Sequence, residues 1–91
     1  MEKAAFIKLV TQILIEDLFV AMEPEQITET QSIANDLGVD SVGFVELATL
    51  VGERLSISFE ENELTDGSFA TIGALWERAS QKLEQKRAAA N

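Results

Sequence analysis

The chain has 91 residues, of which 46% are hydrophobic, and its formal net charge is −9. This length provides a single domain with one modest core. Cysteine and histidine are both absent, which excludes disulfides and removes the commonest general base and transition-metal ligand, so a self-contained hydrolase or metalloenzyme is disfavoured.

The first predicted element is an amphipathic helix over residues 3 to about 20. Its apolar residues recur at helical spacing: Ile7, Val10, Leu14 and Leu18, widened by Phe6, Leu9, Ile13 and Phe19. The N-terminus does not resemble a signal peptide, and charged residues interrupt every apolar run long before it reaches membrane-spanning length. We therefore expect a cytoplasmic protein.

Residues 21 to 40 are predicted to form a long loop. Pro24 and the polar residues from Glu23 to Gln31 end the first helix. A structureless loop of this length is uncommon in a compact domain. Here the loop has four apolar residues that can pin it to the core, namely Ile27, Ile33, Leu37 and Val39. Ser32-Ile33 is a candidate start of a short turn.

A second helix is predicted from Ser41 to about Leu55. Gly38 allows a turn ahead of it. Asp40 and Ser41 are both good N-cap residues, because their oxygens accept hydrogen bonds from first-turn amides. The predicted inner face consists of Val45, Ala48 and Val51, with Phe44, Leu47 and Leu55 beside them.

The C-terminal third is predicted to form a connector, a short helix and a long final helix. Residues 56–59 alternate between polar and apolar side chains, as a strand does. The chain offers no second strand to pair with them, so we expect an extended connector. Residues 60–64 form the short helix and residues 65–68 a turn. The final helix starts near Thr71, which can cap it, and presents Ile72, Leu75, Trp76, Ala79 and Leu83 at helical spacing.

These elements add up to an all-α bundle of three main helices and one short helix. We expect one domain over residues 1–91, with a core at about 3–84 and a frayed tail at 85–91. Four aromatic residues are predicted to lie in the core: Phe44, Phe59, Phe69 and Trp76.

The most specific motif lies where the long loop meets the second helix. Asp36-Leu37-Gly38-Val39-Asp40-Ser41-Val42, followed by Val45-Glu46-Leu47, resembles the D-L-G-x-D-S-L…V-E-L signature of acyl carrier proteins. Size and helix layout extend the resemblance over roughly residues 3 to 84. It implies that Ser41 accepts 4′-phosphopantetheine from coenzyme A. A helix N-terminus suits that role, because its positive end stabilises a phosphate.

The resemblance also assigns partner-facing positions on the second helix. It implies that Val42, Glu46, Thr49 and Glu53 face partner enzymes. For Asp40 two roles stay open, helix capping or engagement of the transferase and its Mg²⁺.

The second helix departs from the family pattern at three positions. Val42 replaces the usual leucine or methionine, and Gly43 and Gly52 stand where acidic residues are common. These glycines weaken the helix by roughly 1 kcal/mol each relative to alanine, so tertiary packing must compensate.

Two other chemistries at this motif are disfavoured. A calcium loop counted from Asp36 needs glycine at its sixth position and glutamate at its twelfth, where this chain has Ser41 and Leu47. Activation of Ser41 as a nucleophile needs an adjacent base, and the chain has no histidine. We therefore predict no metal site and no catalytic residue.

The charge distribution indicates the kind of partner. Residues 16 to 66 contain thirteen acidic residues and one base, Arg54. Such a surface repels nucleic acid and anionic membranes, so neither is an expected partner. It suits basic patches on enzymes, as the resemblance implies. A solvated surface explains any single carboxylate equally well.

We therefore predict a non-catalytic carrier that holds acyl thioesters on a phosphopantetheine arm and works as a monomer. The implied partners are a phosphopantetheinyl transferase and enzymes such as an acyltransferase, a ketosynthase or an adenylating ligase. The motif looks more like freestanding carriers of polyketide-type pathways than like fatty-acid carriers. An aminoacyl or peptidyl carrier, or an acidic interaction module without the arm, are the alternatives.

Overall fold

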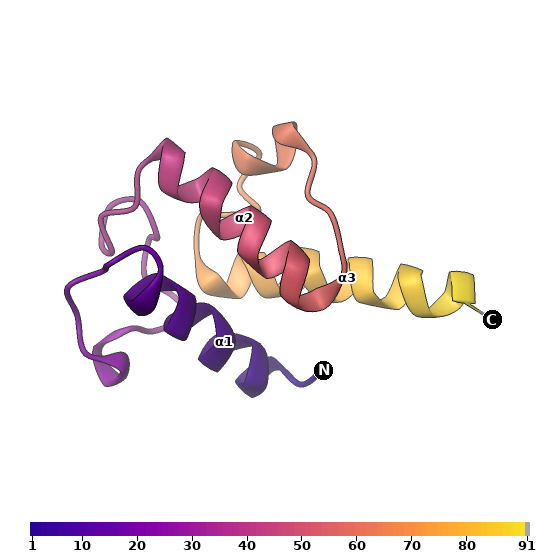
Figure 1. The fold of residues 1–91 in the computed structure, drawn as a ribbon, viewed down its shortest axis with the longest axis horizontal. Helices are drawn as coiled ribbons and strands as arrows, with labels where there is room; N and C mark the ends of the chain where they lie inside the picture. Colours follow the sequence, from indigo (N-terminus) through magenta and orange to yellow (C-terminus); the bar gives the residue numbers. More distant parts are fainter. Residues whose placement is uncertain (91) are drawn as a thin grey trace.

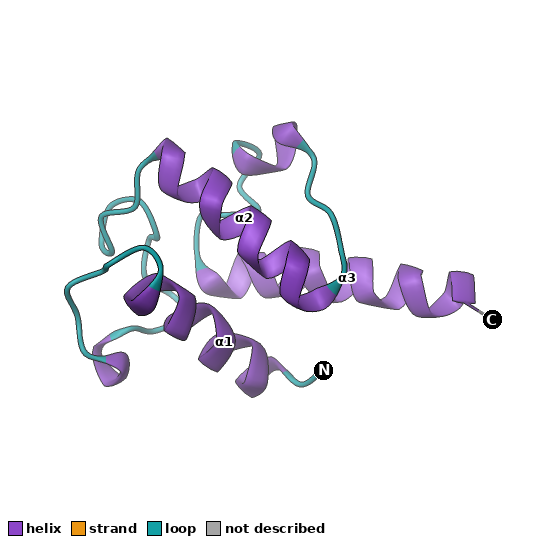
Figure 2. Cartoon of the chain, in the orientation of Figure 1, coloured by secondary structure: helices purple, strands orange, loops and turns teal. Residues whose placement is uncertain are grey.

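The computed structural model describes residues 1–90, and within them the chain is all-α, as predicted (Figures 1 and 2). The elements in chain order are α1 (Lys3–Glu16), η1 (Pro24–Gln26), α2 (Ser41–Leu55), η2 (Glu61–Leu64) and α3 (Ile72–Ala90). Helix α1 packs against both α2 and α3, and η2 packs against α2. The short predicted helix is η2, whereas the 3-10 turn η1 was not foreseen. No helix in residues 1–90 is long and apolar enough to cross a membrane.

One core joins the three helices and the long loop. Its buried hydrophobic residues are Phe6, Val10, Ile13, Leu14, Ile27, Ile33, Leu37, Val39, Leu47, Val51, Phe69, Ile72, Leu75 and Ala79. All four predicted loop anchors are among them. The loop is also tied to the start of α3, because Ile33 N–H donates to the Ala70 carbonyl at 2.9 Å and Gly73 N–H donates to the Glu29 carbonyl at 3.0 Å.

Helix α1 ends at Glu16, so the prediction that it continues to about residue 20 is wrong. The chain folds back on the helix end, where Leu18 N–H donates to the Ile13 carbonyl and Val20 N–H to the Leu14 carbonyl. This reversal places Phe19 at a φ of +58°. Phe19 belonged to the predicted buried stripe, yet it is 82% exposed.

Helix α2 spans Ser41–Leu55, the predicted range, but one residue of its predicted inner face is misplaced. Val45 is 53% exposed, whereas Leu47 and Val51 are fully buried. An α-helix turns by about 100° per residue, so Val45 lies about 160° from Leu47 around the helix. The buried stripe is centred between Leu47 and Ala48, and Val45 therefore faces solvent.

Gly52 is buried on α2 because the connector after the helix crosses it closely. A Cβ at this position would lie 2.6 Å from the Ile57 carbonyl oxygen, and Ile57 N–H donates to the Gly52 carbonyl at 3.0 Å. A backbone atom cannot move aside as the end of a flexible side chain can. The packing thus accounts for a glycine in the helix interior despite its poor helix propensity.

We expect Gly52→Ala to lower the free energy of unfolding by about 1–2 kcal/mol, because the overpacking penalty exceeds the gain in helix propensity. Urea denaturation measures the change. Gly73→Ala is the matched control, since a Cβ there meets its nearest atom at 3.4 Å. A Gly52→Ala variant as stable as the unaltered chain would contradict the close approach.

Helix α3 begins as predicted and continues further than the predicted core. Ala74 N–H donates to Thr71 Oγ1 at 3.0 Å, so Thr71 caps the helix. The helix runs to Ala90 and extends beyond the other two helices (Figure 1). Residues 85–89 are all exposed. The fraying of this tail and the domain limits stay predictions, and Asn91 lies outside the described residues.

A buried carboxylate joins η2 to α3. Glu63 is 5% exposed, and its carboxylate lies 2.9 Å from Lys82 Nζ and 3.2 Å from Arg78 Nε. The Glu60 N–H also donates to it at 2.7 Å. Burial raises the pKa of Glu63, but the Glu60 hydrogen bond and the two cations together outweigh burial, so its pKa lies below the usual 4.5.

This lowered pKa predicts a pH dependence of stability. A carboxylate with a depressed folded pKa stabilises the fold above its unfolded pKa, and that contribution is lost as the pH falls through the folded value. We expect Glu63→Gln to be less stable than the unaltered chain at neutral pH, with the difference shrinking below the usual value of 4.5. Urea denaturation from neutral pH to about pH 3 measures it. A difference that stays constant with pH would refute the ion pairing.

Candidate functional site

The segment before α2 is fixed on both sides of a turn. Asp36 accepts a hydrogen bond from Ser32 N–H at 2.7 Å. Leu37 and Val39 are buried in the core, and Gly38 between them has a φ of +74°. A positive φ costs glycine little. The turn can therefore bury both neighbours and still direct the chain outward into α2.

Asp40 is the N-cap of α2, and Ser41 is the first residue of the helix. Asp40 Oδ1 accepts a hydrogen bond from Gly43 N–H at 2.8 Å, and the Asp40 carbonyl accepts one from Phe44 N–H at 2.9 Å. Of the two candidate caps in the sequence, Asp40 therefore fills the position. Ser41 is exposed, and its hydroxyl is not used as the cap.

The first turn of α2 is suited to a phosphate. Gly43 and Phe44 amides are paired with Asp40, which leaves those of Ser41 and Val42 without a hydrogen-bond partner in residues 1–90. Unpaired first-turn amides and the helix dipole stabilise an anion at this end by about 0.3–1 kcal/mol. A phosphodiester on the Ser41 hydroxyl would lie within this field.

Two grooves adjoin this helix end, and both include Val39 and Asp40 in their walls. The first, which we call the Ser41 groove, has a volume of about 550 Å³. It is lined by Ser41, Phe44, Leu64, Phe69, and parts of residues 32–40 and 65–70. The second, which we call the Phe19 groove, has a volume of about 420 Å³ and lies between residues 17–21, residues 37–40 and the first two turns of α2.

Three aromatic rings close the interior below the Ser41 groove. The Phe69 ring centroid lies 5.1 Å from that of Phe59 and 6.1 Å from that of Phe44. Phe69 is 1% exposed. Phe44, Phe69 and Leu64 give the groove apolar walls, so the space next to Ser41 can shelter an apolar group.

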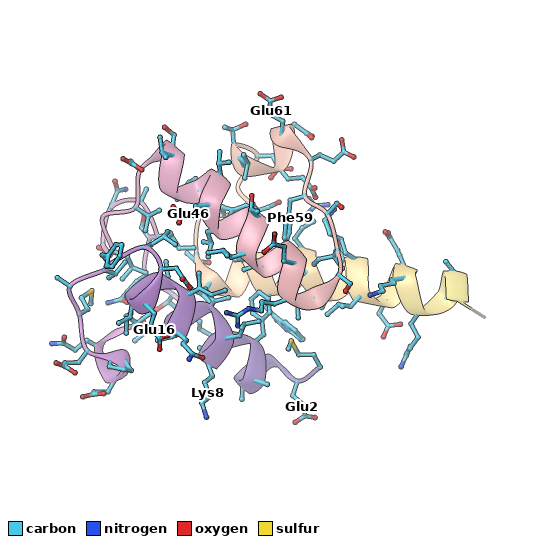
Figure 3. All side chains as sticks on the ribbon, in the orientation of Figure 1. Glu2, Lys8, Glu16, Glu46, Phe59 and Glu61 are labelled. Atoms are coloured by element: carbon cyan, nitrogen blue, oxygen red, sulfur yellow. The ribbon has the colours of Figure 1, made fainter. Side chains whose placement is uncertain are left out.

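The four predicted partner-facing residues lie on one face of α2. Val42, Glu46, Thr49 and Glu53 are all exposed, and their positions fall within an arc of about 60° at 100° per residue. Val42 is 72% exposed, so it lies outside the core. Figure 3 shows Glu46 on α2, and Glu61 projecting away from the bundle on η2. Whether this face binds partner enzymes stays a prediction.

The sequence did not reveal two exposed apolar residues near this site, Phe19 and Val45. Both fit the spacing of an apolar helical stripe. Only the packing of the folded chain shows that they lie outside the core. For Asp40 and Ser41, in contrast, local signals were enough: N-cap chemistry predicts both as candidate caps, and the Asp36–Leu47 motif predicts the role of Ser41 through its resemblance to acyl carrier proteins.

Comparison with known proteins agrees with this geometry. Residues 8–78 match the family described as phosphopantetheine attachment site, a range that includes the Asp40–Ser41 turn, the whole of α2, most of α1 and the start of α3. The acyl carrier protein of Saccharopolyspora erythraea is 30% identical over 77 residues, covering 85% of this chain and 77% of that protein. The chain belongs to the acyl carrier protein family. Its cofactor is 4′-phosphopantetheine, which members of the family carry covalently.

The residues of this carrier protein fit that cofactor. An attachment residue needs a hydroxyl that an enzyme can reach and surroundings that tolerate a phosphodiester. Ser41 is exposed at the helix start, and the helix end offers unpaired amides. The adjacent Ser41 groove has apolar walls against which part of an arm or its cargo can lie.

Proposed function

We propose that Ser41 bears the 4′-phosphopantetheine arm and that the thiol of the arm carries acyl groups as thioesters to separate enzymes. The observation that carries this proposal is the exposed Ser41 hydroxyl at the N-terminus of α2, with Asp40 already serving as the cap. The protein positions and presents the arm, and it has no catalytic residue of its own.

In the proposed loading reaction, a phosphopantetheinyl transferase brings coenzyme A to Ser41. The Ser41 oxygen forms a new bond to the phosphorus next to pantetheine and loses its proton. The P–O bond to the nucleotide half of coenzyme A breaks. The first-turn amides of α2 stabilise the negative charge of the phosphodiester product.

Asp40 can contribute to both capping and loading. Its Oδ1 accepts the Gly43 N–H hydrogen bond, whereas Oδ2 is left for other contacts. Carboxylate oxygens are suitable ligands for Mg²⁺. We therefore propose that Asp40 helps the transferase and its Mg²⁺ engage the site while it holds the helix start in place.

The face formed by Val42, Glu46, Thr49 and Glu53 is the proposed docking surface for enzymes that load and process the acyl group. Its carboxylates attract basic patches, which raises association rates and selects partners. An acyltransferase, a ketosynthase or an adenylating ligase of a polyketide-type pathway would fit this role.

Thioester chemistry tests the carrier function. The protein is incubated with acetyl-coenzyme A, Mg²⁺ and a broad-specificity phosphopantetheinyl transferase, and its intact mass is measured before and after treatment with neutral hydroxylamine. We expect addition of one acetylated arm, followed by loss of the acetyl group alone. A folded protein that gains no mass with several transferases would favour the interaction module instead.

A further inference from the structure

Phe19 occupies a backbone conformation and an environment that both disfavour phenylalanine. Its φ is +58°, in the left-handed region that glycine adopts without strain. It is also 82% exposed. The strain and the exposed ring lower the stability of the isolated domain, so the fold gives no reason for this residue. Exposed aromatic side chains of this kind are typical of residues that become buried in a complex.

Phe19 lies beside the attachment site rather than on a remote surface. It lines the Phe19 groove together with Val42, which directly follows Ser41 and is 72% exposed. Leu18 supports this arrangement, because it packs against Gly43 in the first turn of α2. A Cβ added at Gly43 would lie 3.4 Å from Leu18 Cδ2. The end of α1 and the start of α2 thus form one apolar surface next to Ser41.

The charges in the groove indicate what kind of partner fits it. Asp17, Asp40 and Glu46 all line the Phe19 groove, and none of its twelve lining residues is basic. A complementary protein must therefore present an apolar pocket surrounded by basic residues.

The chemistry of loading selects one enzyme. Enzymes that process the cargo meet the thiol at the far end of the arm, so they can dock on the exposed face of α2 without covering the end of α1. The transferase alone must bring a phosphate to the Ser41 oxygen, so it must cover the residues around it. Val42 and the Phe19 groove lie within that surface.

We propose that Phe19 and Val42 form an apolar anchor that binds in a pocket of the phosphopantetheinyl transferase, with Asp17, Asp40 and Glu46 meeting its basic residues. This inference rests on the proposed attachment at Ser41. It makes Phe19 a specificity-determining residue for loading, at a cost to the stability of the free domain.

The test measures transfer from coenzyme A to the full-length protein at varied protein concentration, with a transferase that loads the unaltered chain. For Phe19→Gly we expect a loss of at least about tenfold in kcat/KM, mainly through KM, as removal of an interface aromatic implies. Phe19→Leu keeps an apolar side chain and should recover part of the loss. The melting temperature of Phe19→Gly should equal or exceed that of the unaltered chain.

Ser56→Gly is the matched control. Ser56 also has a positive φ, +56°, and lies at the C-terminal end of α2, away from Ser41. This substitution relieves the same kind of strain and should leave loading unchanged. Equal kcat/KM for Phe19→Gly and the unaltered chain, or an equal loss in Ser56→Gly, would overturn the proposal.

Two further results have distinct meanings. If several transferases all fail to load the unaltered, folded chain, the proposed attachment fails and the anchor fails with it. If Phe19→Gly is loaded normally but converts a dimer to a monomer in sedimentation velocity, attachment stands, and the anchor proposal is overturned in favour of self-association through this face.

Discussion

Replacing Ser41 by alanine is expected to abolish addition of the phosphopantetheine arm and all acyl loading that depends on it. The substitution removes the only atom to which the proposed reaction joins the arm. Ser41 is exposed and Asp40 caps the helix in its place, so the free energy of unfolding should change by no more than about 0.5 kcal/mol. Intact mass after incubation with coenzyme A and a transferase measures the loading.

Ser58→Ala is the control for this experiment. Ser58 is also an exposed serine, but it lies in the connector after α2, without a helix N-terminus. We expect it to be loaded like the unaltered chain. Loading of a folded Ser41→Ala variant would move the attachment to another residue.

The largest effect on stability is expected for Phe69→Ala. Phe69 is 1% exposed and packs against the rings of Phe44 and Phe59. Its truncation leaves a cavity in the core, which typically costs about 3–5 kcal/mol. That is a large fraction of the roughly 5–15 kcal/mol that stabilises a small domain, so the variant should be partly unfolded at warm temperatures.

Thermal and urea denaturation measure this loss, with Phe19→Ala as the matched truncation of an exposed phenylalanine. Because Phe19 is 82% exposed, its truncation should change the free energy of unfolding by less than about 1 kcal/mol. Similar losses for both variants would contradict the position of Phe69 at the centre of the core.

The elements predicted correctly from the sequence are those specified by local signals. The start of α2 follows from the Gly38 turn and the Asp40 side chain, which act within a few residues. The cap of α3 at Thr71 follows from the same chemistry. The anchors of the long loop, such as Ile33, were evident because apolar residues in a polar segment need burial.

The features that the sequence did not reveal depend on tertiary geometry. Phe19 continues the spacing of the α1 stripe, but the chain reverses at Leu18 and leaves the ring outside. The three-residue spacing of Val45, Ala48 and Val51 predicts that they share the buried face. The spacing does not show how α2 is rotated against its neighbours, and the rotation in the folded chain leaves Val45 exposed. Gly52 was counted only as a weak helix former, since its contact with the Ile57 carbonyl is visible only in the folded chain.

The most direct test of the central claim is to locate the arm on the unaltered protein. After incubation with coenzyme A, Mg²⁺ and a phosphopantetheinyl transferase, the protein is digested and its peptides are fragmented in a mass spectrometer. We predict a single phosphopantetheine, found only on the peptide that contains Asp40-Ser41-Val42 and assigned to Ser41 by its fragment ions. An arm on any other residue, or none on a protein shown to be folded, would contradict the assignment of Ser41 as the carrier residue.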